Sequence, residues 1–171
     1  MAIGQFAGAL EEVIKRKGDS LAQAGKVSHV DGSQIGKIIK GSRKASKEVM
    51  QSAVRHYDDI QLIIGAAEDV TGGACVPFLN RTDLHPSTTY IKTIEEIKEA
   101  EQALMMLPIT KSLEQLAPGD LQTIKNGLME QIEAITALTH NVAVLCRKYD
   151  FSYIALWNEH RDELRMKNYM N

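Results

Sequence analysis

Apolar residues recur every three or four positions along most of this chain, which is the period of an amphipathic α-helix. Over residues 1–70 the pattern predicts five short helices. They cover about 3–17, a segment that begins after Ser20, 32–40, a segment that begins after Ser46, and 60–70. Each is too short to be stable alone, so we expect them to pack around one small core.

Capping residues mark where the second and third of these helices begin. Ser20-Leu21-Ala22-Gln23 is a Ser-x-x-Gln capping box, in which each side chain bonds to the other residue's backbone amide. Asp31-Gly32-Ser33-Gln34, eleven residues later, predicts a second capping box that starts the next helix with Asp31 as its N-cap. This spacing leaves room for one short helix and a tight turn. The helix over 32–40 then carries Ile35, Ile38 and Ile39 on one face, and Ser33, Gln34, Lys37 and Lys40 on the other.

Longer helices follow a change of character after residue 71. Residues 72–88 contain prolines and glycines without periodicity, which predicts a linker. A helix over about 88–107 has a stripe of Ile91, Ile94, Ile97, Ala100 and Leu104, and one over about 152–168 has Tyr153, Trp157, His160 and Leu164 on one face. We therefore expect an all-α protein in three parts: residues 1–71, the linker 72–88, and a helical part over 89–171.

The longest sustained pattern runs from about 120 to 149, where apolar residues fall on the a and d positions of four heptads. Its members are Leu121, Ile124, Leu128, Ile135, Leu138, Val142, Leu145 and Tyr149, with Gln131 as the one polar residue. This coiled-coil-like seam would pack either on helices of the same chain or on a second subunit. We expect a homodimer, held by Leu128, Ile135, Leu138, Val142, Leu145 and Trp157.

Composition and charge narrow the classes of protein to consider. Hydrophobic residues make up 44% of the 171 residues, and no apolar run approaches the roughly 18 residues that span a bilayer. Cys75 and Cys146 stand too far apart for a disulfide framework or a metal site. We therefore expect a cytoplasmic protein without a membrane partner. Residues 1–57 hold 10 basic against 5 acidic residues, whereas residues 58–171 hold 10 against 17, so a polyanion would meet the first part.

The segment IGKIIKGSRKAS, residues 35–46, resembles the lambda-repressor-like, or Xre/Cro, helix-turn-helix family, whose members show Ile-Ser-x-Ile-Glu-x-Gly-x-Arg-x-Pro-Ser there. The resemblance covers about residues 1–70, and the five predicted helices match that domain. The chain departs from the pattern at Ile39, Lys40 and Ala45, and His29 stands where a turn glycine is common. The resemblance implies a five-helix DNA-binding domain, followed here by a C-terminal helical domain.

The resemblance also implies roles for individual residues. Ser33, Gln34 and Lys37 would contact base edges in the major groove of double-stranded DNA, where glutamine can pair with adenine. Lys40, Ser42, Arg43 and Lys44 would contact the sugar-phosphate backbone and supply affinity rather than sequence discrimination. Ile35 and Ile38 would be core residues. The implied function is a transcriptional repressor of phage or mobile-element type, bound as a dimer to a palindromic operator.

Two other interpretations stay open. One is a regulator that binds proteins, an antitoxin or an inhibitor of a host factor, acting through its C-terminal helical domain. The other is a helical bundle whose basic loop is merely solvated.

Two acidic segments carry carboxylates at spacings that could bind a metal ion. Glu95-Glu96-x-x-Glu99 and Glu159-x-x-Asp162 resemble the magnesium motifs of all-helical nucleoside-triphosphate pyrophosphohydrolases, but they stand about 60 residues apart, with Lys98 and Arg161 among the carboxylates. We expect solvated helix faces with i, i+4 ion pairs instead. The five histidines are scattered, and none pairs with a cysteine at ligand spacing. The sequence thus predicts no metal, no cofactor and no enzymatic activity.

Overall fold

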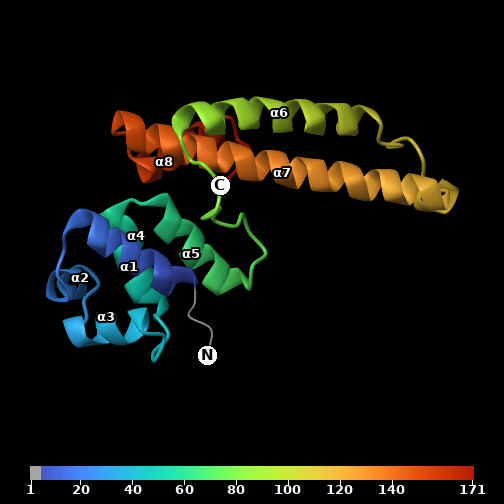
Figure 1. Cartoon of the computed structure of the whole chain (residues 1–171). Coiled ribbons are helices and arrows are strands. Elements are labelled where there is room, and N and C mark those ends of the chain that lie inside the picture. Colours follow the sequence, from blue (N-terminus) through green and yellow to red (C-terminus); the bar gives the residue numbers. More distant parts are fainter. Residues whose placement is uncertain (1–4) are drawn as a thin grey trace. The chain divides into compact units, whose positions relative to one another are not determined.

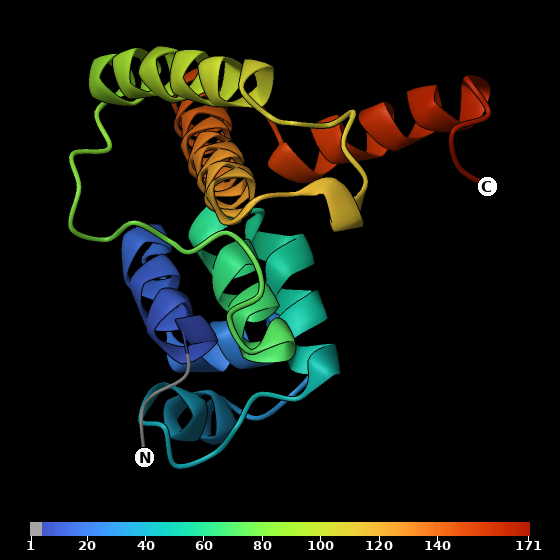
Figure 2. The same ribbon diagram turned by 90° about the vertical axis from the view of Figure 1, so that its right-hand side faces the viewer.

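The computed structural model describes residues 5–171, so the first two residues of the helix predicted over 3–17 lie outside the described part. Within that part the regular structure consists of eight α-helices and one short 3₁₀ helix, without a strand (Figure 1 and Figure 2). The predicted all-α class is confirmed. By its contacts the chain divides into two units. The first comprises the described residues up to Leu79 together with Asp150–Asn171, and the second comprises Asn80–Tyr149.

Six helices belong to the first unit. They are α1 (Gln5–Lys17), α2 (Leu21–Val27), α3 (Gly32–Ile39), α4 (Lys47–Tyr57), α5 (Ile60–Thr71) and α8 (Tyr153–Met166). The ends of the first five lie within one or two residues of the predicted ones where residues are described. None of the helices in residues 5–171 combines the length and the apolar character needed to cross a membrane.

The predicted caps begin these helices. The Ser20 hydroxyl accepts a hydrogen bond from the Gln23 amide at 3.2 Å, and the Gln23 side-chain oxygen accepts from the Ser20 amide at 2.7 Å. This reciprocal pair confirms the capping box. Asp31 Oδ1 accepts from the Ser33 amide at 2.7 Å, so α3 also begins where its N-cap was predicted. Such caps matter because a helix of seven or eight residues leaves most of its amides without a helical partner.

The core of the first unit takes buried side chains from each of α1 to α5. Its fully buried large side chains are Phe6, Leu10, Val13, Ile35 and Leu62. Ile38 is buried as well, so the prediction that Ile35 and Ile38 are core residues is confirmed. Polar bonds tie the helix ends around this core. Arg16 donates to Asp59, the N-cap of α5, at 2.5 Å, and the Tyr57 hydroxyl donates to Asp19 at 2.8 Å.

Glycines bring α2 and α3 unusually close together. A Cβ atom built on Gly25 would lie 2.7 Å from the Val30 carbonyl oxygen and 2.8 Å from the Gly32 amide nitrogen. One built on Gly32 would lie 2.9 Å from the Leu21 carbonyl oxygen. His29, in the turn between the helices, has φ 55°, the left-handed conformation that favours glycine. His29 thus adopts, in the turn between α2 and α3, the backbone conformation that a glycine adopts more easily.

Helix α8 returns to the first unit and is anchored on Asp58. Asp58 Oδ1 accepts from the Ile154 amide at 3.0 Å, and Oδ2 accepts from the Ser152 hydroxyl. Asp58 also ends α4, with φ 43°. The sequence predicts that residues 152–168 belong to the C-terminal part over 89–171. The contacts group them with the N-terminal helices instead, through a carboxylate for which the sequence pattern predicts only a helix boundary.

The second unit is a helical hairpin of α6 (Pro86–Met105) and α7 (Pro118–Tyr149), joined by a loop with the 3₁₀ helix Leu113–Gln115. Residues 73–85, within the predicted linker, form neither helix nor strand. The two long helices run side by side (Figure 1). Small and polar residues lie buried along their contact, namely Thr89, Thr93, Glu96 and Ala100 on α6, and Gly127 and Ala134 on α7. Thr93 donates to the Ala137 carbonyl at 3.2 Å across this contact.

This packing leaves the large apolar side chains outside the hairpin. In the predicted stripe of α6 only Ala100 is buried, whereas Ile91, Ile94, Ile97 and Leu104 are exposed. On α7 the seam residues Leu128, Ile135, Leu138 and Val142 are 40–52% exposed. Small residues let the two backbones approach, so the hairpin closes without its largest side chains. Within the described chain the heptad seam thus has no partner helix that buries it.

A first prediction tests the close approach of α2 and α3. Gly25→Ala should destabilise the protein by about 1–3 kcal/mol, because the added methyl group overlaps rigid backbone atoms. Gly8→Ala is the matched control. Gly8 also lies within a helix, α1, but its Cβ position has nothing within 4 Å, so alanine there should stabilise by up to about 1 kcal/mol. Urea unfolding followed by circular dichroism measures both. Equal effects of the two substitutions would show that α2 and α3 do not approach so closely.

Candidate nucleic-acid interface

The outer face of α3 carries the three residues predicted to contact base edges. Ser33 and Lys37 are exposed, and Gln34 is half-buried. Ile35 and Ile38, on the opposite face, are held in the core of the first unit. Because the helix is fixed from behind, the direction of its outer face is set by packing rather than by its own polar residues. Sequence and structure agree on this division of α3 into two faces.

The loop after α3 is held by the carbonyl group of Lys37. This oxygen accepts from the Ser42 amide at 3.0 Å, from the Ser42 hydroxyl at 3.0 Å and from the Arg43 amide at 3.2 Å. Gly41, with φ 68°, makes the turn possible. The loop is therefore clasped to the end of α3. Ser42 is exposed, and its hydroxyl donates to this carbonyl group, so its predicted contact with the DNA backbone stays a prediction.

Four cationic side chains line this helix end and loop: Lys37, Lys40, Arg43 and Lys44, all exposed. Among residues 5–171 no carboxylate lies within ion-pair distance of any of them. Unpaired cations on one short segment raise the local positive potential, as in surfaces that bind polyanions. The segment can therefore accept phosphate groups without first breaking an ion pair.

Asp31, the N-cap of α3, is an acidic group on which the charge of Lys37 acts. Its pKa lies below the ordinary aspartate value, chiefly because the Ser33 amide and hydroxyl stabilise the carboxylate, with a smaller effect of Lys37. The charged form is thus the capping form at neutral pH. Its negative charge sits at the positive N-terminal end of α3, where it favours the helix.

The residues predicted for oligomerisation belong to both units. Leu128, Ile135, Leu138, Val142 and Leu145 are on α7, in the second unit, and all but the half-buried Leu145 are exposed. Trp157 is on α8, which belongs to the first unit. It stacks edge-on against Tyr153, with ring centroids 6.1 Å apart. The structure therefore separates Trp157 from the α7 seam into another unit.

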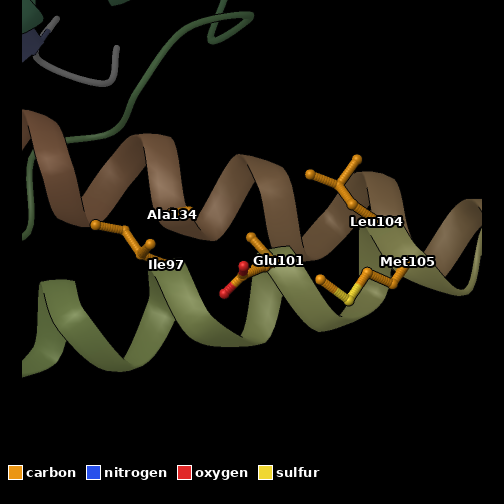
Figure 3. Close-up of a pocket in the computed structure, with 6 residues that line it drawn as sticks. Ile97, Glu101, Leu104, Met105 and Ala134 are labelled. Carbon is orange, nitrogen blue, oxygen red and sulfur yellow. The ribbon is translucent and has the colours of Figure 1, made fainter.

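An apolar groove of about 580 Å³ runs along the hairpin of α6 and α7. Figure 3 shows Ile97, Leu104 and Met105 on α6, and Ala134 on α7 across from them. Glu101 is the one charged residue of its lining. The groove is lined mainly by α6, and Ala134 is the α7 residue of its lining.

The two acidic segments that resemble magnesium motifs lie in different units, and Glu96 of the first makes an i, i+4 ion pair with Lys92 as expected. Glu95, Glu96 and Glu99 lie on α6, and Glu159 and Asp162 lie on α8, which belongs to the other unit. Instead, Glu96 comes together with Glu130 and Glu133 of α7. The expectation of a solvated face is wrong for Glu96, which is buried because it lies on the side of α6 that packs on α7. Glu130 and Glu133 stand three residues apart in the sequence. This spacing places both carboxylates on one side of a helix and is the signal that could have indicated the cluster.

A comparison of this chain with protein-family models, with curated proteins and with solved structures finds no match. The proposed function therefore rests on the residues and the structure of this chain.

Proposed function

We propose that the first unit is a lambda-repressor-like helix-turn-helix domain that binds double-stranded DNA, and that the protein is a transcriptional repressor. The observation that carries this proposal is the unpaired cationic segment directly after a short, rigidly held helix with a polar outer face. A helix of this size fits the major groove of B-form DNA. In this domain α2 and α3 are the two helices of the motif, and α3 is the recognition helix.

The proposal assigns α3 residues according to their place on the helix. Ser33 and Gln34 stand in its first turn, and residues there reach base edges first when a recognition helix enters the groove. Lys37 follows one turn later on the same face. A half-buried Gln34 has fewer rotamers to lose on binding than a fully exposed side chain has, which favours specific pairing with adenine.

The loop residues are assigned to the DNA backbone. Lys40, Arg43 and Lys44 are exposed and unpaired within the described chain, and their loop is clasped to α3 by Ser42. Loop and helix therefore move as one piece. Contacts of these cations with phosphates would set the position of α3 in the groove without reading sequence.

We further propose that the second unit makes the protein a homodimer. A hairpin of two helices with four exposed seam residues on α7 lacks the second layer that helical units use to bury apolar surface. The heptad period of this seam suits another helix of the same kind. A second copy supplies such a helix and at the same time a second DNA-binding unit, as a two-fold operator requires.

The groove of Figure 3 favours a second candidate function, a regulator that binds another protein through α6 and α7. An amphipathic helix of a partner would then occupy the groove. The two candidates differ in the oligomeric state that they predict for the isolated protein. The repressor is a dimer, whereas a monomer favours the regulator that binds another protein.

Gln34→Ala should relax the preference for one base pair in each half-site, a loss of about 1–3 kcal/mol of discrimination. Gln51→Ala makes the same chemical change at an exposed position of α4 and should leave the preference unaltered. Selection of bound sequences from a random DNA library measures both variants. An unchanged base preference in the Gln34 variant would exclude this residue from base reading.

Removing two loop cations should weaken binding to all DNA sequences about equally. Arg43→Ala combined with Lys44→Ala should lower the slope of log affinity against log salt by roughly one to two units, because fewer counterions are released. Lys98→Ala with Lys125→Ala removes the same charge from the second unit and should have little effect. Fluorescence anisotropy across a salt series gives the slopes. A loss confined to the cognate site would show instead that Arg43 or Lys44 reads bases.

Leu138→Asp should split the dimer and lower operator affinity without unfolding the protein. Leu138 is 41% exposed within the described chain, so an aspartate there remains solvated in the monomer but would be buried in the seam of a dimer. Met129→Asp is the control, since Met129 is equally exposed but lies on the opposite side of α7 at helical periodicity. Light scattering measures the mass. A 19.0 kDa monomer of the unchanged protein at tens of micromolar would favour the protein-binding candidate.

A further inference from the structure

Three carboxylates converge where α6 packs on α7. Glu96 comes from α6, and Glu130 and Glu133 come from successive turns of α7. One oxygen atom of each lies within 4.8 Å of those of the other two. Carboxylates at this distance repel each other unless a proton or a cation lies between them. The cluster is contained within the second unit and is separate from the proposed DNA-binding face.

Glu96 gives this cluster its second distinguishing feature, because its side chain is almost completely buried. Only 6% of the residue is exposed. Its Oε1 atom accepts from Lys92 Nζ at 2.6 Å, but its Oε2 atom is buried and has no hydrogen-bond partner in the described chain. An ionised oxygen without a partner in such a place costs several kcal/mol. The fold therefore keeps a strong oxygen ligand in a position that favours a positively charged group.

Lys92 compensates only part of the charge. Its ammonium group pairs with Glu96 and lies 3.9 Å from Glu95, one turn away on α6. The hydrogen bond with Glu96, followed by the charge of Glu96 itself, raises the pKa of Lys92 above its ordinary value. Its side chain is 58% exposed, so the ammonium group can swing into solvent without disturbing the packing. Lys92 thus pairs with Glu96 from an exposed position, and a cation can displace it.

The dimensions of the cluster fit one metal ion. Calcium binds oxygen ligands at about 2.3–2.6 Å, so two ligands on opposite sides of the ion are about 4.6–5.2 Å apart. The Glu96, Glu130 and Glu133 oxygens all lie within 4.8 Å of one another, so they can reach one such ion together. Magnesium has ligands at about 2.0–2.1 Å, so two opposite ligands stand no more than about 4.2 Å apart. Glu130 is half-buried and Glu133 is exposed, so both side chains have room to adjust to either ion.

We propose that Glu96, Glu130 and Glu133 form a binding site for one divalent cation of the calcium or magnesium type. The ion takes the free Oε2 of Glu96 as a ligand from α6 and carboxylate oxygens of Glu130 and Glu133 as ligands from α7. Water completes its shell on the exposed side of Glu133. Such an ion clamps the two helices of the hairpin together and replaces Lys92 as the compensating charge. The proposal stands whether or not the first unit binds DNA.

Titration of the full-length protein with calcium chloride and with magnesium chloride tests the site, with potassium chloride at equal ionic strength as the control. Isothermal titration calorimetry should show one ion bound per chain for at least one of the two cations. The midpoint of thermal unfolding should rise with the same cation, because the ion binds only the folded hairpin. The tighter of the two cations identifies the ion that the site prefers. Absence of saturable binding for both would overturn the proposal.

Matched variants separate this site from a general attraction to acidic residues. Glu96→Gln should weaken binding at least about tenfold by removing a charged ligand, and Glu130→Gln with Glu133→Gln should do the same from the exposed side. Glu99→Gln removes one charge from α6 outside the cluster and should leave affinity within about twofold. Lys92→Gln should tighten binding, since no ammonium group competes. Equal losses for Glu96→Gln and Glu99→Gln, or weaker binding in the Lys92 variant, would contradict the proposed site. The α7 double variant keeps the test decisive even if Glu96→Gln does not fold.

Discussion

The close approach of α2 and α3 is the contact on which the candidate interface depends. Gly25 and Gly32 leave no room for a β-carbon between the two backbones, and His29 accepts a left-handed conformation so that the chain can turn between them. With α2 and α3 locked together, the burial of Ile35 and Ile38 fixes the rotation of α3 on the core. The directions of Ser33, Gln34 and Lys37 follow from these backbone contacts and from the cap that Asp31 forms at the start of the helix.

The second unit follows a different packing rule from the first. In the first unit large apolar residues such as Phe6, Leu10 and Leu62 fill the space between helices. In the hairpin, small residues bring α6 and α7 together, and Gly127 lies so close to α6 and its following loop that a Cβ atom there would come within 2.8 Å of Leu107. Close packing of this kind buries little apolar area per residue. The hairpin therefore satisfies its backbones but leaves most of its hydrophobic free energy to be gained in a further contact.

Most of the secondary structure could be predicted from the sequence, because the residues that begin and end each helix act on their near neighbours in the chain. Ser20, Asp31, Ser46 and Gly72 mark helix ends through hydrogen bonds or backbone conformations that involve only a few neighbouring residues. The faces of α1 and α3 were predictable for the same reason, since a helix with few apolar residues can bury only one side. The anchoring of α8 on Asp58 was not, because it joins residues almost a hundred positions apart and depends on no periodic pattern.

The faces of α6 and α7 could not be predicted because both helices offer two possible packing surfaces. The heptad pattern assigns the seam to the large residues, and it is correct that they share one side of α7. Periodicity cannot tell which side meets α6, since Ala100 and Ala134 permit a closer approach than leucine and isoleucine do. That choice turns Glu96 inward against Glu130 and Glu133 and turns Leu138 outward. The buried carboxylate of Glu96 and the exposed apolar seam thus both follow from the same packing of α6 on α7. Each would be stabilised by a binding partner that the hairpin itself does not contain.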